Sequence, residues 1–164
     1  MRKIKGKITI LVPAYNEEAV IEKMYERLNE VCADLERHTF EFLFVNDGSQ
    51  DRTLQLAKQL KGKDDRVQYV DLSRNFGKEA AMIAGLDYTK GDAVIIIDAD
   101  LQQPPELFGE MIHWWEEGYD DVYAVRKERE GESWLKKWTS RKYYHLLPPV
   151  SQPAVYPQVT DYRP

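Results

Sequence analysis

The chain alternates between short apolar runs and longer stretches in which apolar residues recur every three or four positions. The first pattern is typical of strands and the second of amphipathic helices. Apolar runs lie at 7–14, 40–47, 67–73 and 93–100, and a further run at 121–127 predicts a fifth strand. Strands that alternate with helices form βαβ units, so the pattern predicts an α/β fold with a mostly parallel sheet.

The clearest helical pattern follows the first strand. Its apolar positions form one stripe, made of Val20, Met24, Leu28, Val31 and Leu35. We expect Asn16 to cap this helix. Further helices are predicted at about 51–60, 77–88 and 104–117, and another from about residue 133. Prolines 104 and 105 suit the first turn of the fourth of these helices, and Trp114 and Trp115 within it are interpreted as packing residues.

Composition narrows the class of protein. The 164 residues suit one domain, and a formal net charge of -5 argues against a nucleic-acid partner bound through its phosphates. A single cysteine, Cys32, cannot form an internal disulfide, which favours a reducing cytoplasmic setting and a role as a small buried hydrophobe. No signal peptide is recognisable, and no apolar run approaches the ~18 residues of a membrane span.

The fourth apolar run ends in paired carboxylates. In "IIIDADLQQ", Asp98 and Asp100 are separated by one residue, so an extended backbone would direct both to the same side, with Gln102 continuing the alternation. Two such charges repel each other and are costly to desolvate. A divalent cation that also binds an anionic ligand would make the arrangement favourable.

Other polar residues follow the remaining strands. In a parallel α/β sheet, ligands bind beyond the carboxyl ends of the strands, and this rule brings Glu17, Asp47, Asp98, Asp100 and Gln102 to one rim. A turn or cap role explains any single aspartate at least equally well. It explains the whole set less well. Oxygen ligands of this kind suit Mg²⁺ or Mn²⁺, although D-x-D alone is a weak motif.

Four motifs in order make the pattern specific. The segments "ILVPAYNEE", "FVNDGSQDRT", "LSRNFGKEAAMIAGL" and "IIIDADLQQPPEL" resemble those of family 2 glycosyltransferases, over about residues 7–145. Within that family, they are most similar to the dolichol-phosphate mannose synthases and the bacterial undecaprenyl-phosphate glycosyltransferases. The resemblance implies a GT-A fold, a Rossmann-like sheet with helices on both faces. It also implies an inverting, metal-dependent transfer of a sugar from a nucleoside diphosphate sugar to a polyprenyl phosphate.

The resemblance also implies roles for individual residues. The nucleotide sugar would be bound by Pro13, Tyr15, Glu17, Val45, Asp47, Asp98, Ala99 and Asp100. Mg²⁺ or Mn²⁺ would be held by Asp100 and Gln102. Phosphate would be bound by Arg126, Lys137, Arg141 and Arg163. Catalysis would involve Asp98, Asp100 and Asp161. The last motif departs from the family pattern, because "TDYRP" has Thr160 where a glycine is usual.

The resemblance further implies a catalytic domain at 1–145 and a proline-rich tail at 146–164 with an incomplete acceptor region. We expect a truncated catalytic domain whose full-length form works in the cytoplasm at the inner face of the cell membrane. Contact with the membrane surface would then use sequence absent from this chain. A UDP-sugar is the favoured donor and GDP-mannose the alternative.

Other classes of protein remain open at this point. A non-catalytic nucleotide-sugar-binding domain, or an inactive fragment, would use the same rim without transfer. A nucleotidyltransferase would carry a glycine-rich loop where this chain has "PAYNEE", and a dinucleotide dehydrogenase would carry G-x-G-x-x-G. A receiver domain would use Asp47 as phosphoacceptor but would not need the D-x-D segment.

Overall fold

Strands and helices alternate along the chain in the computed structural model, which describes residues 5–124. The chain divides into two units, Met1–Val122 and Tyr123–Pro164, and every described helix and strand belongs to the first. The predicted α/β alternation is confirmed. In order, the elements are β1 (Lys7–Ala14), α1 (Ile21–Ala33), β2 (Thr39–Asn46), α2 (Thr53–Lys63), β3 (Val67–Asp71), α3 (Lys78–Tyr88), β4 (Ala93–Ile96), the 3₁₀ turn η1 (Pro105–Leu107) and α4 (Phe108–Glu116).

The four strands form one sheet in the order β3-β2-β1-β4, and every pair is parallel. Strands β1 and β2 are central and almost wholly buried, because helices cover both of their faces. Pro13 near the end of β1 is tolerated there, since β4 pairs with β1 only as far as Leu11. Strand order reverses at β1, with β2 and β3 on one side and β4 on the other.

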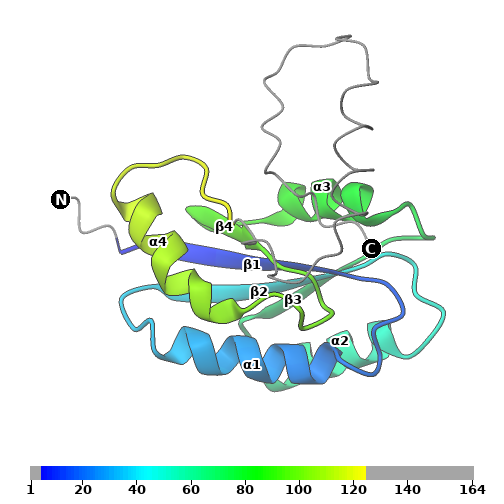
Figure 1. The fold of residues 1–164 in the computed structure, drawn as a ribbon. Helices are drawn as coiled ribbons and strands as arrows, with labels where there is room; N and C mark the ends of the chain where they lie inside the picture. Colours follow the sequence, from blue (N-terminus) through cyan, green and yellow to red (C-terminus); the bar gives the residue numbers. More distant parts are fainter. Residues whose placement is uncertain (1–4, 125–164) are drawn as a thin grey trace, which may run out of the picture. The chain divides into compact units, whose positions relative to one another are not determined.

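Helices lie on both faces of the sheet (Figure 1). On one face, α1, α2 and α4 pack against the sheet. Their buried contacts include Ile21, Met24, Leu28, Leu56, Leu60, Phe108 and Ile112. On the other face, α3 places Ala81 against Leu11, Leu43 and Val45. Two apolar cores therefore fix the central strands, and the strand ends become a rigid platform.

Several element boundaries differ from the predictions. Helix α1 begins at Ile21, and its buried stripe is Ile21, Met24, Leu28 and Cys32, while Val20 is only half-buried. The predicted cap at Asn16 is wrong, because the helix begins later and no side chain caps it. Strand β4 ends at Ile96, and residues 121–124 form no strand. The rest of the predicted fifth strand and the helix from residue 133 lie outside the described residues.

The two tryptophans of α4 and the cysteine of α1 differ in burial. Trp115 of α4 packs against the core, as predicted, whereas Trp114 is 42% exposed and its ring lies next to those of His113 and Tyr119. Cys32 is buried, and burial raises the pKa of its thiol to about 12, which suits an unreactive hydrophobe. Within residues 5–124, no helix has the length and apolarity required to cross a membrane.

Candidate functional site

The carboxyl ends of β1, β2 and β4 meet at one rim of the sheet (Figure 1). Glu17 follows β1, Asp47 follows β2, and Asp98 and Asp100 follow β4. Strand order reverses at β1, and α/β proteins bind ligands outside the carboxyl ends of the strands at such a point, a region that we call the crevice. The structure thus brings the predicted acidic residues to the expected edge.

Reciprocal hydrogen bonds join the loop after β1 to the loop after β2. The Asn16 side-chain oxygen accepts from the Gln50 N–H at 2.9 Å, which is the role it has in place of helix capping. The N–H of Glu17 donates to the Thr53 hydroxyl at 2.8 Å, and the N–H of Glu18 donates to Asp51 at 3.1 Å. The two loops therefore behave as one unit, which we call the loop clamp (residues 15–18 and 49–53).

Asp51 is the central hydrogen-bond acceptor of the loop clamp. Burial by itself would raise the pKa of its carboxyl, but hydrogen bonds from the Thr53 hydroxyl, the Thr53 N–H and the Glu18 N–H together hold that pKa below its ordinary value. The hydroxyl of Thr53, a fully buried residue, donates to Asp51 at 2.6 Å and accepts from Glu17. These contacts fix the position of the Glu17 backbone at the rim.

Asp47 is a buried carboxylate, and both of its oxygens accept backbone hydrogen bonds. The N–H of Phe76 donates to Oδ1 at 2.8 Å, and the N–H of Gly77 donates to Oδ2 at 2.9 Å. These donors lie immediately before α3, so Asp47 holds the start of that helix against the end of β2. This carboxylate therefore anchors the backbone before α3.

Asp98 is engaged by two side chains. The ammonium of Lys78, at the first position of α3, lies 2.7 Å from Oδ1 and 2.8 Å from Oδ2. The Gln103 amide donates to Oδ2 at 2.9 Å. The carboxylate is thus oriented from two directions, with only 17% of the side chain exposed.

Asp100 is exposed, and its Oδ1 accepts the Gln102 N–H at 2.9 Å. The extended alternation predicted for Asp98, Asp100 and Gln102 is wrong, because the chain turns after Ile97 and Leu101 has a φ of 61°. A short hydrogen-bonded turn follows β4 instead. Asp100 and Gln102 are still neighbours, because the hydrogen bond of that turn joins them, and both are exposed.

Glu17 is electrostatically coupled to the D-x-D segment. Burial raises the pKa of the Glu17 carboxyl, and the negative charges of Asp100, Asp51 and Asp98 raise it further. These carboxylates are therefore close enough to repel one another through the crevice. Because a negative rim of this kind is stabilised by cations, it favours the binding of a positive ion.

The donor set fits a magnesium or manganese ion that shares its ligands with a substrate. In the described part of the chain, no three His, Cys, Asp or Glu side chains cluster closely enough to make a metal site by themselves. Mg²⁺ commonly takes one or two protein carboxylates and fills its other positions with water and substrate phosphate oxygens. An exposed carboxylate at Asp100 and an exposed amide at Gln102 are hard oxygen ligands of the required type.

The remaining predicted residues differ in accessibility. Tyr15 is 41% exposed at the rim, whereas the side chains of Pro13, Val45 and Ala99 are buried. A contact between Val45 and a nucleoside would therefore use its backbone. Five predicted residues lie outside the described part of the chain: Arg126, Lys137, Arg141, Asp161 and Arg163.

Sequence reasoning missed four residues of this rim: Lys78, Gln103, Asp51 and Thr53. Each of them stands in one of the four motif segments that end at the rim. The position of Lys78 in "LSRNFGKE" was therefore a usable signal, since that segment follows the third strand. Its pairing with Asp98 could not be predicted, because it depends on how α3 packs on the sheet.

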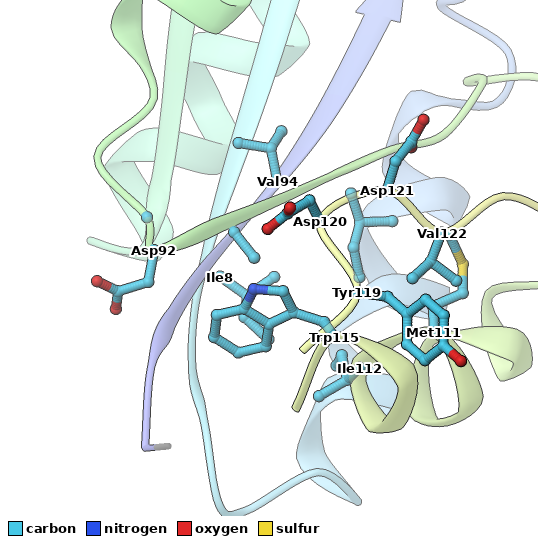
Figure 2. A pocket seen from close by; sticks show the side chains of 13 residues that line it. Ile8, Asp92, Val94, Met111, Ile112, Trp115, Tyr119, Asp120, Asp121 and Val122 are labelled. Atoms are coloured by element: carbon cyan, nitrogen blue, oxygen red, sulfur yellow. The ribbon is translucent and has the colours of Figure 1, made fainter. Parts of the chain in front are cut away.

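Among the residues that the structure describes, two hollows adjoin β4 or the segment that follows it. One, of about 590 Å³, is open and borders the D-x-D turn, with Gln102 and Gln103 on one side and Lys23 and Arg27 of α1 on the other. The second, of about 370 Å³, is lined by residues 91–95, at and before the start of β4, and by Trp115 and Tyr119 among others (Figure 2). Only the first adjoins the carboxyl ends of the strands, so the second is not part of the candidate site.

Relatives of known family resemble this chain along nearly its whole length. It is 48% identical over 155 residues to the uncharacterized glycosyltransferase YkcC of Bacillus subtilis, covering 94% of this chain and 48% of that protein. It is 41% identical over 157 residues to a bactoprenol glucosyl transferase of Shigella phage SfX, covering 96% of this chain and 51% of that protein. The chain thus spans about half the length of these relatives.

Solved structures of glycosyltransferases have a fold similar to that of this chain. The mannosyltransferase PcManGT of Pyrobaculum calidifontis, in complex with GDP-Man and Mn²⁺, matches with a TM-score of 0.62 at 22% identity, over 87% of this chain and 38% of that one. TarS of S. aureus, in complex with UDP-GlcNAc, matches with a TM-score of 0.59 at 23% identity, over 77% of this chain and 36% of that one. The chain has the GT-A fold of these glycosyltransferases.

The family assignment rests on the sequence as a whole. The model for glycosyl transferase family 2 matches residues 9–162, which include every segment that forms the rim. Together with the identity to relatives named as glycosyltransferases, this match agrees with an acidic crevice at the reversal of strand order. The chain therefore belongs to glycosyltransferase family 2.

Proposed function

We propose that this chain is the donor-binding part of an inverting glycosyltransferase that moves a hexose from a nucleoside diphosphate sugar to a polyprenyl phosphate. The favoured donor is a UDP-sugar, with GDP-mannose as the alternative. Relatives named bactoprenol glucosyl transferase, such as that of Shigella phage SfX at 41% identity, support a lipid phosphate acceptor. With such an acceptor, the enzyme would work at the cytoplasmic face of the membrane.

The observation that best supports this proposal is the acidic crevice. Glu17, Asp98 and Asp100 follow the ends of β1 and β4, and the pKa of Glu17 is raised by burial and by the negative charges of the two aspartates. A nucleoside diphosphate is itself anionic, so it can bind such a rim only with a cation between the two sets of charges. The proposed nucleoside contacts, from Tyr15, Glu17 and the Asp47 region, border the same crevice.

Asp100 and Gln102 would hold a Mg²⁺ or Mn²⁺ ion against the donor diphosphate. When bound, the ion would supply positive charge that stabilises the departing nucleoside diphosphate. Asp98, which the Gln103 amide orients, would contact the ribose and sugar beside it. The loop clamp would keep Tyr15 and Glu17 in place, since its hydrogen bonds hold the loop after β1.

The acceptor would need little activation. A phosphate monoester has a second pKa of about 6, so its oxygen is largely ionised at neutral pH and no strong general base is required. That oxygen would form a bond to the anomeric carbon while the bond from that carbon to the donor diphosphate breaks, and the electron pair would leave with the nucleotide. One in-line displacement inverts the anomeric centre. Arg126, Lys137, Arg141 and Arg163, with Asp161, are proposed to align the acceptor phosphate.

A transfer assay tests the proposal. Purified protein would be incubated with radiolabelled UDP-glucose or GDP-mannose, Mn²⁺ and undecaprenyl phosphate in detergent, and label would be measured in the organic extract. A complete acceptor site should give metal-dependent label in the lipid with one donor, in a glycosyl phosphate bond that mild acid cleaves. Donor binding without any lipid product would instead indicate a non-catalytic nucleotide-sugar-binding domain or an inactive fragment, and absence of nucleotide binding would contradict all of these functions.

A further inference from the structure

Lys78 occupies an unusual electrostatic position. It is the first residue of α3, where the helix dipole makes a positive charge unfavourable. Its ammonium contacts both oxygens of Asp98, at 2.7 and 2.8 Å, and its side chain remains 40% exposed. The lysine is therefore held by the carboxylate across the crevice and not by its own helix.

The backbone next to Lys78 is fixed, whereas its ammonium is carried on a flexible side chain. Asp47 accepts the N–H groups of Phe76 and Gly77, and so fixes the backbone immediately before Lys78. Beyond Cα, a lysine has a flexible four-carbon stem with a compact charge at its end. A half-exposed ammonium on such a stem can exchange one anionic partner for another without any change in the fold.

We propose that Lys78 stands in for the divalent cation at Asp98 in the donor-free protein and releases this carboxylate only when metal and nucleotide diphosphate arrive together. This inference rests on the proposed function, because it assumes a metal-bound nucleotide donor. Lys78 is then a positioning residue that acts through Asp98. It couples the binding of the metal to the binding of the nucleotide diphosphate.

The reason lies in repulsion between cations. A Mn²⁺ ion that approaches Asp100 alone meets an Asp98 already neutralised by Lys78, and the ammonium repels it at short range. A diphosphate brings negative charge that gives the ammonium a new partner, which removes this cost. Metal and nucleotide therefore bind with positive coupling, and by linkage each raises the affinity for the other by the same factor.

The test measures Mn²⁺ binding without nucleotide, by loss of the free-ion electron paramagnetic resonance signal. Lys78→Met removes the charge and keeps most of the stem, and Lys78→Gln is a second, polar replacement. Both should bind Mn²⁺ alone roughly tenfold more tightly than the wild type, because Asp98 becomes available beside Asp100 and the repulsion is gone. The factor by which UDP raises Mn²⁺ affinity should fall by a similar amount.

Two control variants separate this effect from net charge. Lys78→Arg keeps a cation at Asp98 and should retain weak binding of Mn²⁺ alone. Lys90→Met makes the same change in net charge at the opposite end of α3, on an exposed residue, and should change Mn²⁺ affinity less than twofold. Circular dichroism and thermal unfolding would establish that each variant is folded.

The outcomes distinguish this inference from the proposed function. Unchanged or weaker binding of Mn²⁺ alone by folded Lys78→Met and Lys78→Gln would overturn the cation role, and so would an equal gain in Lys90→Met. Failure of the wild type to bind UDP or GDP with Mn²⁺ would instead count against the proposed function. The comparison of Mn²⁺ binding needs no nucleotide, so the two results are independent.

Discussion

At the level of single residues, carboxylates that look alike in the sequence have different roles. Asp47 is buried and uses both oxygens to hold the backbone before α3. Asp51 is the hub of the loop clamp, and Asp98 is paired with Lys78. Asp100, two residues after Asp98 in the D-x-D segment, is exposed. The degree to which each oxygen is already engaged decides which carboxylate is available to a ligand.

Asp100→Asn keeps the shape of the side chain and removes the charge proposed to hold the ion. We expect Mn²⁺-dependent UDP affinity to fall at least tenfold, with unchanged thermal stability in the absence of ligand, because the substitution relieves repulsion with Glu17. Isothermal titration would measure the affinity. Asp87→Asn, an exposed change on α3, is the control and should bind like the wild type. A sharp loss of stability in Asp100→Asn would indicate a structural role instead.

Asp64 provides a pH-dependent test of stability away from the rim. Hydrogen bonds from the Arg66 side chain, opposed in part by burial, lower the pKa of this carboxyl from 3.8 to about 2. The Tyr25 hydroxyl also donates to it at 2.7 Å. Because the folded pKa is the lower one, this stabilisation is complete above the unfolded value and is lost as pH falls through the folded value.

Asp64→Asn should therefore lower the free energy of unfolding by about 2 kcal/mol at neutral pH. The difference from the wild type should shrink as pH approaches about 2, where the wild-type carboxyl becomes protonated. Urea unfolding at a series of pH values would measure both effects. Asp65→Asn, an exposed neighbour, should be close to neutral throughout. A constant difference at all pH values would mean that the ionised carboxylate is not the stabilising group.

At the level of elements, the rim is built from loops that hold one another. The loop after β2 contacts both the loop after β1 and the segment before α3. Gly48 lies at the centre of this arrangement, with a φ of 64°, and a Cβ there would lie 2.2 Å from the Arg74 carbonyl carbon. Only glycine allows this close approach of two backbones.

Gly48→Ala should destabilise the protein by roughly 2–4 kcal/mol, because it combines backbone strain with a clash against another backbone segment. Urea unfolding would measure the loss. Gly62→Ala is a matched control, since it lies in α2 and, apart from its chain neighbours and the nearby backbone of that helix, nothing lies within 4 Å of its Cβ position. That control should gain about 0.5–1 kcal/mol from helix propensity. Equal effects of the two substitutions would contradict the close packing inferred at Gly48.

At the level of the whole molecule, one parallel sheet fixes all the proposed donor contacts. These contacts, of which Pro13 is the first in sequence and Gln102 the last, lie on strand ends or on the loops that follow them. Apolar cores on both faces hold the sheet that carries them. Such a platform can hold a ligand without a large change in fold. The 164-residue chain should therefore bind nucleotide by itself, although it spans about half the length of its relatives.

Thermal unfolding with ligands tests this prediction. UDP and Mn²⁺ together should stabilise the chain by about 2.7 kcal/mol at a hundredfold excess over the dissociation constant, and each alone should stabilise it much less. GDP in place of UDP would show which nucleobase is preferred. Equal stabilisation by UDP with and without Mn²⁺ would falsify the proposed role of Asp100 and Gln102 in holding the ion.

Sequence alone predicted the βαβ alternation, the parallel sheet and the gathering of acidic residues at one rim. These features follow from local periodicity and from the rule that parallel strands end at the same edge. Family membership was also apparent from the sequence, because four motifs in order carry it. The Asn16 cap was wrong, because a contact with the distant Gln50 outweighed local propensity there. The extended path of the D-x-D segment was wrong, because a local turn with a positive φ at Leu101 follows β4.

Only the tertiary structure decided which polar groups are already engaged. Lys78 and Asp98 are 20 positions apart, and Asp47 and Phe76 are 29 apart. Their contacts exist because α3 packs on the sheet with its first turn at the carboxyl ends of the strands. Residue type and spacing along the chain determine what chemistry is available. The packing of helix against sheet determines which charges meet, because it alone fixes distances between segments that the sequence leaves independent.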